Sequence, residues 1–216
     1  MTASSSPSTT SSGNDKALKK ARSTRERLVR CGIEVLTEQG FSSTGIDQIL
    51  KRVGVPKGSF YHYFSSKDAF GQAVIEGYAE YFANKLDRHL LNVARDPLDR
   101  IHDFIADARA GMQRYAFRRG CLIGNLGQEF GGDERFADAL EAVFIDWQGR
   151  IAVCLNEAKS QGHIPNSTDT EQLAEIFWMG WEGAILRAKL IRNVRPIDHF
   201  EAYFFASLAA GCTQLR

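Results

Sequence analysis

The chain has 216 residues, of which 44% are hydrophobic, so it can bury a sizeable core in one large or two small domains. No apolar run approaches the ~20 residues of a membrane helix. The Ser/Thr-rich stretch 1–13 lacks the apolar segment of a signal peptide. We therefore expect a cytoplasmic protein without a membrane partner. The net charge of +1 hides an asymmetry, because residues 1–66 carry ten Lys or Arg against five Asp or Glu, whereas residues 67–216 carry 17 against 21.

The basic N-terminal part is expected to contact nucleic acid, although a solvated basic face is the plain alternative. Residues 1–22 are expected to form a disordered basic tail, followed by a helix over 23–39 that Gly40 ends. A second helix is expected from Thr44, as its cap, to Val53, because its apolar residues recur at helical spacing.

The stretch from Val55 to Phe64 is the most informative part of the chain. Pro56 suits the first turn of a short helix because it has no N–H to lose there. Phe60 and Phe64 share one face and can anchor this helix inward. The other face offers a charge, a hydroxyl, a phenol and an imidazole, from Lys57, Ser59, Tyr61 and His62. With the preceding helix, this arrangement predicts a helix-turn-helix, whose second helix enters the major groove; an ordinary helical hairpin in a core is the alternative.

This region resembles the DNA-binding domain of the TetR family of transcriptional repressors, on Gly40-Phe41, Thr44-Gly-Ile46, Val55–Phe64 and Ser66-Lys67. The resemblance implies an all-α fold, with a three-helix helix-turn-helix domain over 23–68 and a helical ligand-binding and dimerisation domain over 69–216. It implies that double-stranded operator DNA is contacted by Thr44, Gly45, Lys57, Gly58, Ser59, Tyr61, His62, Tyr63 and Lys67. Helix N-termini and lysines are suitable phosphate binders.

Five further helices are expected, and no stretch predicts a strand. Their ranges are 67–91, 96–118, 133–161, 169–192 and 197–212. The glycine-rich segment 120–127 implies either close backbone approach or a loosely wound helix. Gly180 and Gly183 permit close helix approach in the penultimate helix, and the last helix is apolar on more than one side. The family resemblance implies that these two helices form a homodimer interface; burial within one chain is the alternative.

Neither metal nor cofactor chemistry is predicted. The cysteines Cys31, Cys121, Cys154 and Cys212 are scattered without paired metal spacing. No catalytic carboxylate pair, Ser-His-Asp set or phosphate loop is present, so we do not expect an enzyme. An enzyme built on a helical bundle, or a helical protein-interaction module, are the alternatives to a DNA-binding regulator.

Residues 120–129 and 177–189 resemble the acrylate-responsive (AcuR-type) and N-ethylmaleimide-responsive branch of the TetR family. This resemblance implies repression that a small reactive or acidic metabolite relieves. Independently, Cys121 follows Arg118 and Arg119 and precedes a helix, and both neighbours are expected to lower the pKa of its thiol. A thiolate attacks α,β-unsaturated electrophiles, so Cys121 is a candidate sensor, with Lys189 as a charge partner; simple packing is the alternative.

A reversible mode of ligand binding stays open beside the covalent one. In that mode a carboxylate is bound by Arg187, Arg119 or Lys189, beside an apolar wall and a few polar groups. The candidate wall and polar residues are Trp178, Trp181, Phe177, Asn125, Gln128, Glu129 and Glu182. Trp178 and Trp181 can equally be core residues, and Arg187 can equally pair with Glu182 or Glu129.

These observations predict a dimeric repressor in which a ligand tilts the helix over 67–91. The tilt would change the separation of two recognition helices, which must match half-sites roughly 34–36 Å apart.

Overall fold

The structure, a computed structural model, describes residues 11–130 and 132–209. Over these residues it contains helices and no strand, which confirms the all-α prediction. The helices are α1 (Ser11–Gln39), α2 (Ile46–Val53), α3 (Lys57–Tyr63), α4 (Lys67–Leu90), α5 (Pro97–Arg114), α6 (Leu122–Phe130), α7 (Glu134–Ser160), α8 (Thr170–Ile191) and α9 (Arg195–Ala209).

Helix α1 begins earlier than expected. Residues 11–22 are helical, so the predicted disordered tail is wrong for them, whereas residues 1–10 lie outside the described part of the chain. The physical reason is that the stretch from Lys16 to Arg22 consists of Lys, Ala, Leu and Arg, which are strong helix formers that continue the following helix.

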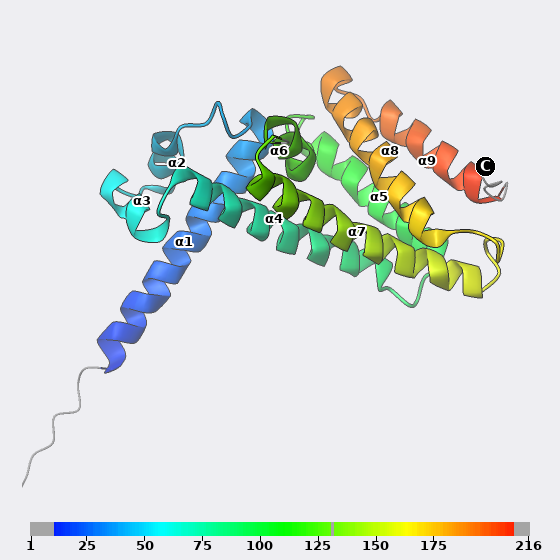
Figure 1. The fold of residues 1–216 in the computed structure, drawn as a ribbon, viewed down its shortest axis with the longest axis horizontal. Coiled ribbons are helices and arrows are strands. Elements are labelled where there is room, and N and C mark those ends of the chain that lie inside the picture. Colours follow the sequence, from blue (N-terminus) through cyan, green and yellow to red (C-terminus); the bar gives the residue numbers. More distant parts are fainter. Residues whose placement is uncertain (1–10, 131, 210–216) are drawn as a thin grey trace, which may run out of the picture.

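Helices α1, α2 and α3 form a small head at one end of the molecule (Figure 1). Ile49, Leu50 and Val53 are the buried face of α2. Gly54 ends this helix with a left-handed φ of 72°, a conformation that glycine adopts without steric cost. Pro56 then occupies the N-cap position of α3. The Phe60 ring, on the inner face of α3, is fully buried.

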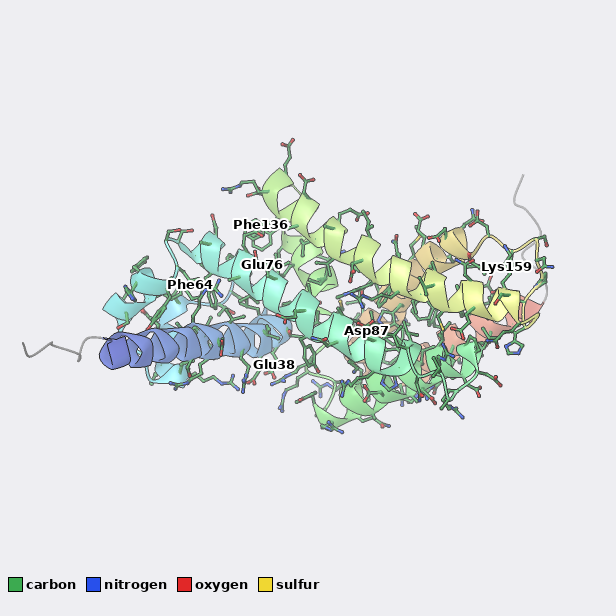
Figure 2. All side chains as sticks on the ribbon, turned by 90° about the horizontal axis from the view of Figure 1, so that it is seen from below. Glu38, Phe64, Glu76, Asp87, Phe136 and Lys159 are labelled. Carbon is green, nitrogen blue, oxygen red and sulfur yellow. The ribbon has the colours of Figure 1, made fainter. Side chains whose placement is uncertain are left out.

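The remaining helices form an elongated body, and α4 runs from the head along it (Figure 1). Aromatic rings fill its centre: Trp147 of α7 lies with its ring centroid 4.4 Å from Phe82 of α4 and 5.0 Å from Trp178 of α8. Figure 2 shows Glu38, at the end of α1, near the middle of the molecule beside the body, and Lys159 at the end of the body farthest from the start of α1. The joint between head and body therefore lies at the C-terminal end of α1.

Most helix ends agree with the sequence, and the differences have local causes. Ser66, Asp133 and Asp169 accept backbone N–H hydrogen bonds as caps of α4, α7 and α8. Thr44 is not a cap: Gly45 occupies that position, and the Thr44 hydroxyl donates to the Gly40 carbonyl instead.

The glycine-rich segment is a regular helix, α6, after an irregular link. The last helix begins at Arg195, and the residues after Ala209, including Cys212, lie outside the described part. Within residues 11–130 and 132–209, no helix is long and apolar enough to cross a membrane, and no group of three or more potential metal ligands occurs.

Candidate nucleic-acid interface and ligand cavity

The free face of α3 carries the predicted DNA-binding side chains. Tyr61 is 62% exposed and His62 is also exposed, whereas Tyr63 is half-buried against the core. Gly58 has open space where a Cβ would stand, so another backbone can approach it. Lys57 lies at the start of this helix and forms an exposed ion pair with Asp47 of α2, with 3.0 Å between Nζ and Oδ2. Ser59 is half-buried on the same helix.

Three other predicted DNA contacts lie beside α3 in different environments. Gly45 is exposed at the N-terminus of α2, where free backbone N–H groups suit a phosphate. Thr44 is buried, so its side chain supports the turn rather than the surface. The Lys67 ammonium donates to the Phe41 carbonyl at 2.8 Å and lies over the Phe41 ring, so it is engaged within the head.

A cavity of about 830 Å³ lies between the head and the body. Its walls come from α1, α4, α5 and α8, and from the link before α6. Val29 and Ile33 of α1 face it from the head, and Tyr78, Phe82 and Trp181 face it from the body. The volume is that of a small-molecule site. Because α1 forms one wall, an occupant would touch both parts of the molecule.

Cys121 lines this cavity at the point where α6 begins. Its side chain is 6% exposed, and its carbonyl accepts the N–H of Asn125, as the N-cap residue of a helix does. The expected lowering of its pKa is wrong. Burial, followed by the charge of Glu182, raises the pKa of the thiol well above its ordinary value, although the N–H groups of Gly124 and Ile123 oppose this. The cation of Arg119 is engaged elsewhere, with Glu38.

Glu182 reaches the same point from α8. A Cβ on Gly124 would lie 2.0 Å from its Oε2, so the carboxyl presses against the backbone of the first turn of α6. Burial raises the pKa of this carboxyl to about 7, and its contact with Cys121 opposes the rise. The structure thus brings together two predicted ligand residues, Cys121 and Glu182, whose proximity the sequence did not indicate.

Two other predicted ligand residues converge on α1 instead. The Asn125 side-chain amide and the Lys189 ammonium both donate to the Thr37 carbonyl, each at 3.2 Å. Burial lowers the pKa of Lys189, and the charge of Glu38 partly offsets this. These contacts fasten α6 and α8 to the last turn of α1, which leads into the helix-turn-helix.

Glu129 forms a second connection between α6 and the head. Its carboxylate accepts the backbone N–H of Phe41 at 2.9 Å and that of Ser42 at 2.7 Å. Burial opposes ionisation, but these N–H groups, the Ser42 hydroxyl and Lys67 outweigh it and hold the pKa of Glu129 below its ordinary range. Its role is therefore to hold the turn between α1 and α2, rather than to face the cavity.

The remaining predicted ligand residues separate into wall, core and surface. Trp181 lines the cavity, whereas Trp178 and Phe177 are buried among aromatic rings. Arg187 is exposed on α8, and Gln128 is exposed on α6. The alternative pairing of Arg187 with Glu182 or Glu129 is not what the structure shows, because those carboxyls contact α6 and the head.

The wall contributed by the head was missed from sequence. Glu26, Arg30 and Glu34 of α1 line the cavity, and Arg119 forms an ion pair with Glu38 of the same helix. Charged residues on one face of a helix normally indicate solvent contact. In the sequence, these charged residues of α1 indicate a polar helix face. They do not indicate that this face lines a cavity or pairs with Arg119.

Comparison with known proteins covers both parts of the chain. Residues 28–74 match the model of bacterial regulatory proteins of the tetR family, and residues 97–204 match the tetracyclin repressor-like C-terminal domain.

Several characterised regulators are similar to the chain over most of its length. The transcriptional regulator AcuR of Cereibacter sphaeroides is 50% identical over 83% of this chain and 82% of its own. The HTH-type transcriptional repressor NemR of Escherichia coli K12 is 30% identical over 83% of this chain and 91% of its own. A solved regulatory protein TetR from Rhodobacter sphaeroides is 49% identical, with a TM-score of 0.82 over 85% of this chain and 97% of its own.

Proposed function

The chain belongs to the TetR family of bacterial regulatory proteins, and from this premise we propose that it is a homodimeric repressor released from its operator by a small electrophilic or acidic metabolite such as acrylate. TetR-family regulators bind operator DNA, usually act as homodimers and are not enzymes. The observation that carries the proposal is the cavity between α1 and the body, because Cys121 lines it and α1 forms one wall.

Release requires the ligand to favour a head position that does not fit the operator. Asn125 and Lys189 fasten the body to Thr37, and Glu129 holds the turn that follows Gly40. A ligand wedged against α1 acts directly on these contacts. The equilibrium between DNA-fit and DNA-unfit states shifts only to the extent that the ligand binds the second state more tightly.

Both covalent and reversible binding are compatible with the cavity lining. A covalent inducer would add to the Cys121 thiol, which lines the cavity. A reversible carboxylate would lie beside the apolar wall of Trp181 and Phe82, and it would have to compete with Glu38 for Arg119 and with Asp107 for Lys85. Arg187 plays no part in this proposal, because it is exposed on α8.

The proposed homodimer uses the outer face of α8. Exposed apolar residues recur there at helical spacing: Ile176, Met179, Leu186 and Leu190. Gly183 lies on the same helix with open space where a Cβ would stand, so a second helix can approach closely. Gly180, which was expected to serve the same contact, instead accommodates the Phe200 ring of α9 within the chain. Two-fold pairing would present two α3 helices to two half-sites.

The first expected result concerns release. N-ethylmaleimide should dissociate the wild-type protein from its own upstream DNA in a gel-shift assay, and Cys121→Ser should reduce this response by at least about tenfold in reagent concentration. Cys31→Ser is the matched control, because Cys31 is also buried but belongs to the head core. Release of Cys121→Ser at wild-type reagent concentration would refute covalent sensing. A thermal-shift screen with acrylate and other short acids tests the reversible mode.

The second expected result concerns DNA. Tyr61→Ala and Lys57→Ala should each weaken operator binding by about 1–3 kcal/mol per head, because each removes an exposed contact group from α3. The melting temperature should stay near that of the wild type. Tyr81→Ala is the matched control, measured without inducer because Tyr81 lines the cavity; its side chain is 55% exposed on α4, outside the head. Wild-type affinity of both α3 variants would contradict the assigned DNA face.

A further inference from the structure

The sulfur of Cys121 lies where the backbone can stabilise a negative charge. The residue precedes α6, whose first N–H groups have no partner within the helix. The backbone N–H groups of Gly124 and Ile123 favour the ionised form of the sulfur and so act to lower its pKa. A thiolate formed there would thus be stabilised, although the resting thiol keeps its proton because it is buried beside a carboxyl.

The carboxyl beside this thiol is not used by the surrounding structure. Oε1 of Glu182 is buried and has no hydrogen-bond partner among the described residues. Oε2 lies against Gly124, at a distance that only a residue without a Cβ allows. Buried carboxyl oxygens are normally satisfied, so an orphaned one needs an explanation. The thiol of Cys121 begins the same turn of α6, and the charge of Glu182 is one of the causes that raise its pKa.

Other titratable groups near the pair have their own engagements. Tyr78 of α4 is buried, and burial and the charges of Cys121 and Glu182 raise its pKa well above its ordinary value, so it stays a neutral phenol. Lys189 of α8 donates to Thr37, and Arg119 pairs with Glu38. A proton leaving the thiol therefore has Glu182 as its adjacent acceptor. With a pKa of about 7, this carboxyl is substantially ionised near neutral pH.

We propose that Glu182 accepts the thiol proton of Cys121 when an α,β-unsaturated electrophile enters the cavity. This inference rests on the covalent mode of the proposed function. The sulfur forms a bond to the β-carbon of the electrophile while the carbon–carbon π bond breaks, and the S–H proton passes to the Glu182 carboxylate. The α-carbon then takes a proton from water in the cavity, and Glu182 later releases the thiol proton to solvent. The net reaction is a thioether addition, which needs no oxidant or further reactant.

The test is the rate at which N-ethylmaleimide modifies Cys121, followed by peptide mass spectrometry from pH 6 to pH 9. In the wild type, the rate should rise as Glu182 ionises through about pH 7 and then level off. Glu182→Gln should lower the alkylation rate at pH 7.5 by about 10²-fold and remove the rise in rate around pH 7. A purely electrostatic role predicts the opposite, because losing the carboxylate lowers the thiol pKa and speeds alkylation. An equal or faster rate in Glu182→Gln would therefore overturn the proposal.

Controls separate this proposal from the one on which it rests. Glu175→Gln removes an exposed carboxyl from the same helix and should leave the rate unchanged. Glu182→Asp keeps a carboxyl, so its alkylation rate should still rise near neutral pH. If this rise is missing in Glu182→Asp, the proposed role of Glu182 is refuted even if the glutamine variant does not fold. A wild-type protein without a Cys121 adduct would refute covalent sensing as a whole. Unaltered alkylation in Glu182→Gln would refute only the role of Glu182.

Discussion

Replacing Phe60 with alanine should unfold the head while the body stays folded. The Phe60 side chain is fully buried, and its ring centroid lies 5.3 Å from that of Phe64 and 5.6 Å from that of Phe70. Large-to-small changes at such positions cost about 3–5 kcal/mol. Helix α3 has seven residues, too few to be stable without this packing. We therefore expect operator binding to be lost because the recognition helix no longer forms.

Hydrogen exchange separates this loss from the loss of a contact group. Amides of α2 and α3 should lose protection in Phe60→Ala, whereas those of α7 and α8 should keep it. Tyr61→Ala is the matched comparison, because it removes the adjacent aromatic ring from the exposed side of the same helix and should leave all of these amides protected. Wild-type protection of α3 in Phe60→Ala would show that the anchoring role of this ring is overstated.

The head could be predicted closely from sequence because its determinants are local. Apolar spacing over 46–53, the turn at Gly54 and Pro56 at the start of α3 all act within a few residues. The inward ring of Phe60 and the outward ring of Tyr61 follow from helical periodicity alone. Helix α1 begins earlier than predicted because the helix propensity of residues 16–22 outweighs their polar composition.

The functional connections of the body could not be predicted in the same way. Glu129 contacts Phe41, and Lys189 contacts Thr37. The partners lie 88 and 152 residues apart in the sequence, and helical periodicity predicts no contact over such distances. The direction of the Cys121 pKa was wrong for a similar reason. Local neighbours pointed to a lowered value, but burial and Glu182, which comes from another helix, decide the outcome.

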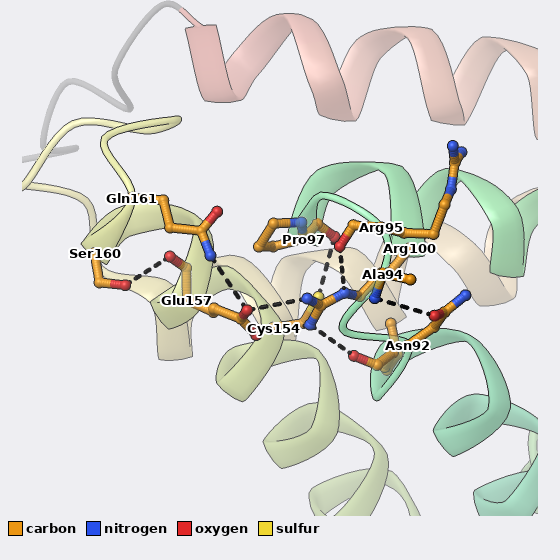
Figure 3. A network of polar contacts seen from close by, with 10 residues as sticks. Asn92, Ala94, Arg95, Pro97, Arg100, Cys154, Glu157, Ser160 and Gln161 are labelled. Atoms are coloured by element: carbon orange, nitrogen blue, oxygen red, sulfur yellow. Dashed lines mark hydrogen bonds and ion pairs between the residues drawn. The ribbon is translucent and has the colours of Figure 1, made fainter.

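The far end of α4 is held by a network that contrasts with the connections at the head (Figure 3). The guanidinium of Arg100 donates to the Leu90 carbonyl at 3.2 Å, which satisfies a free acceptor at the end of α4. It also donates to the Arg95 carbonyl at 2.9 Å and to Glu157 of α7 at 2.7 Å. Movement of α4 caused by a ligand is therefore expected at the head end, while this end acts as the fixed point.

Replacing Arg100 with leucine should lower the free energy of unfolding by about 2–4 kcal/mol, measured by urea denaturation. The side chain is 3% exposed, so the Leu90 and Arg95 carbonyls would lose a buried donor that leucine cannot replace. Glu157 is partly exposed and can turn to water, which limits the cost. Arg95→Ala is the matched control. It removes an exposed arginine with its own ion pair to Asp103 and should cost less than about 1 kcal/mol.

The same variant tests whether the fixed end of α4 matters for release. If Arg100 anchors the pivot, Arg100→Leu should need more inducer for the same release from DNA, because part of the ligand-driven movement is lost at a loosened end. The comparison belongs at a temperature where both proteins are fully folded, since partial unfolding would itself reduce DNA binding. A destabilised variant with unchanged inducer sensitivity would assign Arg100 to stability alone. It would also place the flexible element within α4 or α6, because those helices connect the cavity to the head.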